Sequence, residues 1–332
     1  MTIGLLDPGL ETHDGALSSN LGDVIIQRAV TRELRALFGD EPLYTCSTQE
    51  FLGREQRRQL AACRHVFVGG SNLLSSNMLD AQRDNPPGMP LFYRQWLLSP
   101  FDVAHLRHAV LFGVGWWQYQ RPAGLFTRWL LRAALSGRVA HSVRDSYTAE
   151  MLRAAGIARV LNTGCPTMWP LADLPADAIP TAKADDALVM LTDYNRVPDA
   201  DRALIELLGK KYRRLYLWPE GRADVEYVAE LGVAATMLEH RFDAFDEFVR
   251  THPSFDYVGT RLHGGIYCLL HRRRALVLGI DNRAREIAKD TGLPTADRSD
   301  VAAIERWIDA AQPTTISMPT RAIAEWRSQF RG

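Results

Sequence analysis

Residues 255–265, FDYVGTRLHGG, carry the clearest fold signal in this chain. The short apolar run FDYVG is typical of a buried strand, and the apolar spacing of the following IYCLL is typical of a helix. A strand, a glycine-bearing turn and a helix make the repeating unit of parallel sheets. We therefore expect Arg261 and His263 at the carboxyl end of a strand, beside the start of a helix.

The same alternation extends outward from this stretch in both directions. Residues 21–38 have apolar side chains at helical spacing, with Asn20 as the expected N-cap and Gly39 as the stop. Strands are predicted at 3–7, 42–46, 65–70, 109–115, 138–143, 158–164, 187–193, 214–219, 255–259 and 274–280. Further helices are predicted at 146–155, 199–210, 222–231, 242–251, 262–271 and 282–291, and the end, 301–330, as helical with Trp307 and Trp326 as anchors.

The alternation lapses over residues 170–186, which contain three prolines and no periodicity. This break predicts an N-terminal domain at 1–170, a linker at 171–186, a C-terminal domain at 187–300 and C-terminal helices at 301–332 that pack back across the junction. The expected fold class is α/β, with two Rossmann-like, doubly wound domains facing across a cleft. Ligands of open parallel sheets bind at the carboxyl ends of the strands, so the cleft is the expected site.

Composition indicates an ordinary globular protein. Hydrophobic residues make up 46% of the 332, and Lys+Arg and Asp+Glu balance at 39 each, which leaves no global field to attract nucleic acid. The N-terminal sequence MTIGLLDPGL has no basic leader, and no window reaches about 20 apolar residues, so a cytoplasmic protein without a transmembrane segment is expected. The four scattered cysteines are expected to be reduced. The lone pair His105 and His108 is a weak metal signal, and no metal site is predicted.

Arg261 and His263 are the predicted catalytic residues. A guanidinium fork suits a carboxylate or phosphate, and an imidazole can give or take a proton near neutral pH. Thr260 and Gly264 flank them, where free backbone N–H groups favour an anion and glycine lets a ligand approach the main chain. The structural alternative is an arginine at a sheet edge and a core histidine bonded to backbone; the strand–turn–helix setting favours function.

Arg144, in the segment SVRD at 142–145, also follows a predicted strand. Asp145 is explained as the N-cap of the next helix, whereas Arg144 is expected either to have a structural role or to face Arg261 across the cleft. Asn282 and Arg283 are further cleft candidates, although Asp281 or Asn282 also suits an N-cap and Arg283 suits an i, i+3 pair with Glu286.

Two loops after strands complete the candidate set. They hold Asn20 and Asp23, and then Gly69, Gly70, Ser71 and Asn72. Neither loop is a dinucleotide fingerprint or a Walker loop, so a dinucleotide or triphosphate site is disfavoured. Trp116, Trp117 and Trp218 lie near strand ends, where an indole can stack on a sugar, but core packing is the favoured role.

The ordered set N-x-G-D at 20–23, GGS at 69–71, SVRD at 142–145, GTRLH at 259–263 and DNR at 281–283 resembles the polysaccharide pyruvyl transferase family. The resemblance runs from the first strand to about Pro294. The family often shows three glycines at 69–71, and often an acidic residue with proline where this chain has Cys165-Pro166-Thr167.

This resemblance implies a GT-B-like fold and transfer of pyruvate from phosphoenolpyruvate to two sugar hydroxyls, which forms a cyclic ketal and releases phosphate. Arg261 and Arg144 would then hold the donor with Thr260, Gly264, Asn282 and Arg283, and His263 would be the acid. The loops at Asn20–Asp23 and Gly69–Asn72 would serve the acceptor. No cofactor and no metal are implied. The acceptor is a sugar or glycan precursor; its lipid linkage, peripheral membrane contact and oligomeric state are left open.

Two other functions remain open on the sequence. A GT-B glycosyltransferase that uses a nucleotide sugar would share the architecture and the basic residues, and Glu286 is the one well-placed acidic candidate for its ribose. An inactive carbohydrate-binding relative would keep the fold alone. Intact Arg261 and His263 argue against this second alternative.

Overall fold

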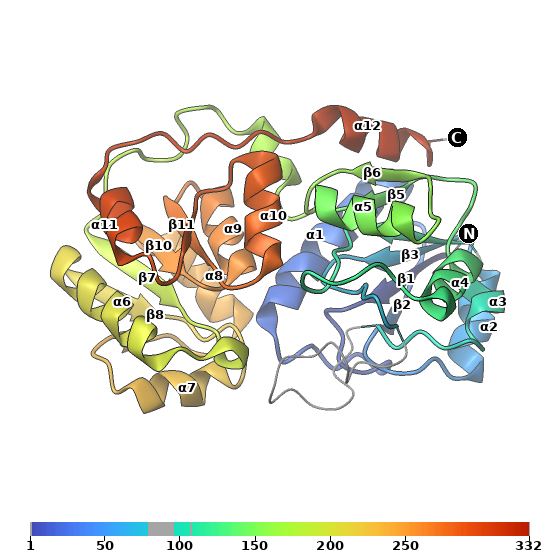
Figure 1. Cartoon of the computed structure of the whole chain (residues 1–332), viewed down its shortest axis with the longest axis horizontal. Helices are drawn as coiled ribbons and strands as arrows, with labels where there is room; N and C mark the ends of the chain where they lie inside the picture. Colours follow the sequence, from blue (N-terminus) through green and yellow to red (C-terminus); the bar gives the residue numbers. More distant parts are fainter. Residues whose placement is uncertain (1, 79–95, 107, 332) are drawn as a thin grey trace. The chain divides into compact units, whose positions relative to one another are not determined.

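The computed structural model describes residues 2–78, 96–106 and 108–331. The chain forms two compact units, shown in Figure 1. Unit 1 comprises Met1–Ser18, Ile26–Trp169 and Met318–Gly332, and unit 2 comprises Ser19–Ile25 and Pro170–Ser317. The residues predicted as a linker, 171–186, therefore count with unit 2. The predicted C-terminal segment 301–332 divides between the two units.

The main sheet of unit 1 is parallel, with the order β2-β1-β3-β4. Its strands are β1 (Ile3–Asp7), β2 (Leu43–Ser47), β3 (His65–Gly69) and β4 (Ala109–Phe112). A second parallel pair, β5 (His141–Val143) with β6 (Val160–Asn162), is joined to it through a bridge between Val114 and Val143. Alternate side chains of these strands point to opposite faces, as the pleat requires.

Helices cover both faces of the unit 1 sheet. One core cluster combines Leu5 and Phe67 of the sheet with Val30 of α1 (Leu21–Phe38) and Trp326 of α12 (Thr320–Ser328). Trp326 stacks on Phe112 with ring centroids 4.4 Å apart, so it is the anchor that the sequence predicted. The other cluster draws on α2 (Arg54–Ala62), α3 (Val103–Leu106), α4 (Leu125–Ala134) and α5 (Ser146–Ala154).

Unit 2 is a six-stranded parallel sheet in the order β12-β11-β10-β7-β8-β9. Strand order reverses between β7 and β10, which is the switch point where ligands of such sheets bind. The strands are β7 (Asp186–Met190), β8 (Arg214–Leu217), β9 (Thr236–Met237), β10 (Phe255–Gly259), β11 (Ala275–Gly279) and β12 (Thr295–Asp297). The helices are α6 (Pro198–Lys211), α7 (Asp224–Leu231), α8 (Phe242–Thr251), α9 (Leu262–Leu270), α10 (Asn282–Thr291) and α11 (Val301–Asp309).

These topologies confirm two Rossmann-like α/β units with parallel sheets. That the units face one another across a cleft stays a prediction. The sequence did not predict the short strands β9 and β12. The prediction of a helical end over 301–330 is wrong in part, because residues 310–319 between α11 and α12 are not helical. Pro313 lies in this stretch, and proline lacks the N–H that a helix interior needs.

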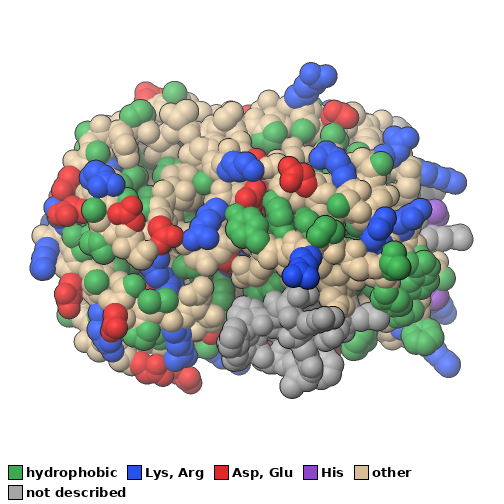
Figure 2. All heavy atoms as spheres, in the orientation of Figure 1, with side chains coloured by type: hydrophobic (Ala, Val, Ile, Leu, Met, Phe, Trp, Pro, Cys, Tyr) green, Lys and Arg blue, Asp and Glu red, His purple; other side chains and the backbone are tan. Residues whose placement is uncertain are grey.

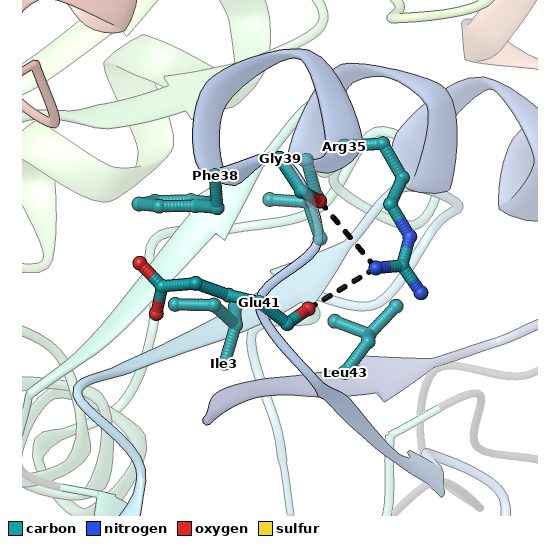
Figure 3. Close-up of a pocket in the computed structure, with 7 residues that line it drawn as sticks. Ile3, Arg35, Phe38, Gly39, Glu41 and Leu43 are labelled. Carbon is teal, nitrogen blue, oxygen red and sulfur yellow. Dashed lines mark hydrogen bonds between the residues drawn. The ribbon is translucent and has the colours of Figure 1, made fainter. Parts of the chain in front are cut away.

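Gly39 ends α1 as predicted, in the left-handed region with φ 61°. Figure 3 shows how Arg35 completes this terminus: its Nη1 donates to the carbonyls of Gly39 (3.5 Å) and Glu41 (3.1 Å). The adjoining hollow, lined also by Ile3, Phe38 and Leu43, measures about 10 Å³, enough for roughly one water molecule. This hollow lies where the end of α1 packs against β1 and β2. Among the described residues, no helix is both long and apolar enough to span a membrane.

Candidate active site

The sequence-predicted Arg-x-His segment lies at the switch point of unit 2. The backbone N–H of Thr260 donates to Met190 O on β7 (2.8 Å), and the hydroxyls of Thr260 and Thr192 are 2.8 Å apart. Arg261 is the N-cap residue of α9, with extended backbone at φ −88°. Arg261 and His263 thus stand at a strand-to-helix turn, as predicted, and both are buried.

The guanidinium of Arg261 is held by two carboxylates. It donates from Nε to Asp224 Oδ2 (2.9 Å) and from Nη2 to Asp224 Oδ1, and Nη2 also donates to Asp193 Oδ1 (3.1 Å). Burial works to lower the pKa of Arg261, but Asp224 outweighs it and holds the pKa above its ordinary value. The planar fork that the sequence predicted to bind an anion therefore already has carboxylate partners from the chain itself. That it binds the donor stays a prediction.

The two carboxylates differ in how firmly the chain holds them. Asp224 is fully buried, and it also accepts from the N–H groups of Gly221 (2.7 Å) and Asp193 (2.9 Å). The side chain of Asp193 is 24% exposed, and burial together with the neighbouring Asp224 raises its pKa. Asp193 is therefore the partner of Arg261 that an incoming anion can replace at lower cost.

A second cation lies beside the first. Arg283 donates from Nε to Asp281 Oδ2 (2.7 Å) and from Nη2 to the Tyr194 hydroxyl. The guanidinium carbons of Arg261 and Arg283 lie 5.1 and 5.7 Å from the centre of the Tyr194 ring, so both cations lie against the same aromatic ring. Two of the predicted donor-binding arginines thus lie together in unit 2.

The start of α10 holds Arg283 in place. Asp281 is the N-cap and accepts from the N–H of Arg283 (2.9 Å), which confirms one of the two predicted caps. The predicted i, i+3 pair of Arg283 with Glu286 is wrong, since Arg283 turns to Asp281 and Glu286 lies 3.7 Å from Lys289. Asn282 is buried in the first turn.

Glu220, which follows β8, is a site residue that the sequence analysis missed. Its Oε2 accepts from the N–H of Gly264 at the start of α9 (3.1 Å), next to His263. Only 3% of Glu220 is exposed, and burial raises its pKa to about 7, against the opposing pull of Arg261. A carboxyl group with this pKa can both hold and release a proton near neutrality.

The predicted loop of Asn20 and Asp23 belongs to the same cluster. The N–H of Leu21 donates to Glu220 O (2.9 Å), and the backbones of Asn20 and Gly221 form an isolated antiparallel β-bridge. Asn20 Nδ2 also donates to Asp23 Oδ2 (3.1 Å). Residues about 200 positions away in the sequence are thus placed beside Glu220, and the first turn of α1 is part of this site.

The glycines of α9 have a packing role. A Cβ on Gly264 would lie 2.3 Å from Met190 Sδ, and one on Gly265 would lie 2.7 Å from a methyl of Val277. The missing side chain of Gly264 therefore lets α9 approach the sheet. That Gly264 also lets a ligand approach the main chain stays a prediction.

The remaining candidates gather in unit 1 around Arg144. Its side chain is 1% exposed and donates from Nε to Asp145 Oδ2 (3.2 Å) and from Nη2 to Asn72 Oδ1. Asp145 also caps α5 by accepting from the N–H of Thr148 (2.7 Å), as predicted. Ser71 is in the left-handed region with φ 57°. That Arg144 faces Arg261 stays a prediction.

Gly69 ends β3 and Gly70 follows it, and both allow α1 to pack closely. A Cβ on Gly70 would lie 2.1 Å from a methyl of Ile26, and one on Gly69 would lie 3.0 Å from a methyl of Val30. Nearby, Asp7 ends β1 and was also missed; burial raises its pKa to about 6 despite hydrogen bonds from Gln27 Nε2 (2.9 Å) and Gly9 N–H (2.8 Å). A simple signal was available for both missed acids, since Asp7 ends a strand and Glu220 lies shortly after one.

Other side chains named in the sequence analysis have structural roles. Trp116 and Trp218 are fully buried, and Trp218 stacks on Phe245 with centroids 4.0 Å apart. All four cysteines are free thiols. The ring of His105 bonds to Phe101 O (3.3 Å), and within the described part of the chain no three His, Cys, Asp or Glu side chains cluster as metal ligands would.

Comparisons with known proteins show which family this chain belongs to. No curated protein matches the chain significantly. Among solved structures, the chain is similar to one described as the crystal structure of LpCGTa in complex with UDP, at 12% identity and a TM-score of 0.40, covering 99% of this chain and 93% of that one. The sequence model of the polysaccharide pyruvyl transferases matches residues 20–282, which include every candidate of the unit 2 cluster except Arg283. By this match over more than half its length, the chain belongs to the polysaccharide pyruvyl transferase family.

Proposed function

We propose that this protein transfers pyruvate from phosphoenolpyruvate to two hydroxyls of a sugar in a glycan or glycan precursor, forming a ketal and releasing phosphate. The observation that supports this most is that Arg261 and Arg283 both lie against the ring of Tyr194. His263 and Glu220 belong to the same cluster, and the chain is a member of this family. Phosphoenolpyruvate carries a carboxylate and a phosphate on one carbon, so two adjacent guanidinium groups match its shape and charge.

Donor binding would replace one carboxylate partner of Arg261 with an oxygen of the donor. Asp224 stays as the buried support of Arg261, while the more exposed Asp193 gives way to an oxygen of the donor. Arg283 would take the second anionic group of the donor. Because one anion replaces another, the positive charge of Arg261 stays neutralised both with and without the donor.

The chemistry needs a proton at the methylene carbon. In the proposed scheme His263 gives that proton, and the C3 carbon becomes a methyl group. The first sugar oxygen then bonds to C2 while its proton passes to a base. Cleavage of the bond between C2 and the phosphate oxygen releases phosphate, and the second hydroxyl bonds to C2 with loss of its proton. The scheme uses no cofactor and no metal.

Glu220 is the proposed second acid–base group. It hydrogen-bonds to the residue after His263, and its pKa of about 7 suits a group that accepts a proton from a hydroxyl and later returns it. Asn20 and Asp23 lie on the segment that bonds to Glu220, so they are proposed to bind the acceptor sugar.

Donor binding is testable without knowing the acceptor. A ligand that binds only the folded state stabilises it, by about 2.7 kcal/mol at a hundred times its Kd. Phosphoenolpyruvate should therefore raise the melting temperature, and UDP-glucose should not. Stabilisation by UDP-glucose alone would instead favour the glycosyltransferase alternative. An inactive relative would bind a sugar but neither donor.

A further inference from the structure

Helix α4 of unit 1 has two apolar faces, and only one of them is in the core. Leu130, Leu131 and Ala134 are fully buried against the rest of the unit. On the opposite side, Leu125 is 83% exposed, Trp129 is 49% exposed and Phe126 is 44% exposed. Packing of the core accounts for the first apolar face. It does not explain why the exposed face is apolar as well.

The exposed apolar residues form a continuous patch. Leu125 and Trp129 are one turn apart on the helix, and the rings of Phe126 and Trp129 lie 5.5 Å apart. Figure 2 shows apolar side chains gathered on the surface in the place where Figure 1 draws α4. We call Leu125, Phe126 and Trp129 the α4 patch.

Positive charge accompanies this patch. Arg128 and Arg132, also one turn apart, line an open groove of about 480 Å³ together with Leu125 and Trp129. Arg121 and Arg138, on either side of the helix, are exposed as well. From residue 103 to residue 143 the sequence contains five arginines and no Asp or Glu. The preceding acid, Asp102, is fully buried and paired with Arg57 at 2.8 Å, so it does not neutralise this charge.

We propose that the α4 patch and its arginines dock this protein on the surface of an anionic phospholipid bilayer. A short helix with Trp, Phe and Leu on one side and arginines beside them suits the boundary between headgroups and acyl chains. Indole and phenyl rings settle at this depth, and guanidinium groups pair with lipid phosphates. The proposal rests on unit 1 alone and does not depend on the proposed reaction.

Vesicle flotation with the full chain tests this proposal. The protein should float with vesicles of phosphatidylcholine and phosphatidylglycerol, bind pure phosphatidylcholine far less, and lose binding as salt is raised. The double variant Arg128→Gln with Arg132→Gln should weaken partitioning about 25-fold, or about fivefold for each arginine. Trp129→Ala should weaken it on the order of tenfold.

Matched variants separate docking from general surface changes. Arg54→Gln with Arg58→Gln removes an equally spaced exposed pair from α2, and Phe51→Ala removes a ring that is 58% exposed elsewhere in unit 1. Both should bind vesicles as the unmodified protein does, with all melting temperatures unchanged. Equal binding to neutral and anionic vesicles, or none to either, would overturn the proposal. Self-association that Trp129→Ala abolishes, without vesicle binding, would instead assign the patch to a second copy.

Discussion

The carboxylate of Glu220 accepts a hydrogen bond from the backbone N–H of Gly264 at 3.1 Å. It therefore occupies the anion position that the start of α9 offers, beside Arg261 and His263. Because Glu220 is buried with a pKa of about 7, the site holds a proton close to neutral pH before any substrate enters.

Glu220→Gln should remove a pH dependence of stability. The pKa of the folded state, about 7, lies above the ordinary value of 4.5, so the stabilising contribution is complete below pH 4.5 and is lost as pH rises through about 7. The loss is on the order of 3 kcal/mol. Glutamine stays neutral, so urea unfolding of the variant should lack this decline. Glu239→Gln, in an exposed pair with Arg241, should keep it. An unchanged pH profile in Glu220→Gln would show that this carboxyl does not hold the proton.

Arg261→Lys should be nearly as damaging as Arg261→Ala. Lysine keeps the charge but cannot bond to both oxygens of Asp224 and also reach Asp193. Breaking a buried pair costs about 3–5 kcal/mol, measurable as a lower midpoint of urea unfolding. Arg285→Lys changes a half-exposed pair with Asp297 and should cost less than about 1 kcal/mol. Near-normal turnover and stability of Arg261→Lys would rule out the bidentate role.

The sequence was informative where local patterns decide the structure. Ten strands and the boundaries of α1 follow from apolar runs and from residues such as Gly39, whose left-handed backbone ends the helix. Arg261 and His263 were located because a strand, a turn and a helix meet at them. Each of these signals lies within a few neighbouring residues.

Long-range pairings were out of reach of the sequence. Nothing near Arg261 indicates that Asp224 and Asp193 hold its guanidinium, because strand order decides which loops meet at the switch point. The place of Glu220 shortly after β8 was a local signal, but its raised pKa depends on burial, which the sequence alone does not show. The packing role of Gly264 was not predicted, because the atom that an added Cβ would meet belongs to Met190, on a different strand.

His263→Gln should keep donor binding and lose about 10²–10⁴ in turnover, the usual contribution of a positioned acid or base. Glutamine retains a polar side chain of similar size at this buried position but cannot give up a proton. Isothermal titration with phosphoenolpyruvate and steady-state kinetics measure the two effects separately. Lost binding with an intact rate for bound donor would make His263 a ligand contact only.

Activity should survive exhaustive chelation with at most a small loss. The described residues provide no cluster of three metal-ligating side chains, and the proposed scheme neutralises the donor with arginines. Phosphate release is measured before and after treatment with EDTA. A requirement for added Mg²⁺ or Zn²⁺ would show that the arginine scheme is incomplete.

The most direct test incubates the protein with phosphoenolpyruvate and a panel of sugar acceptors, free, nucleotide-linked and lipid-linked, and follows the acceptor by mass spectrometry. The account predicts release of phosphate and an acceptor that gains the mass of one pyruvate less one water, as a ketal on two hydroxyls requires. Glu220→Gln and His263→Gln should each reduce this product. Transfer of a sugar from a nucleotide donor, with phosphoenolpyruvate inert on every acceptor, would contradict the account.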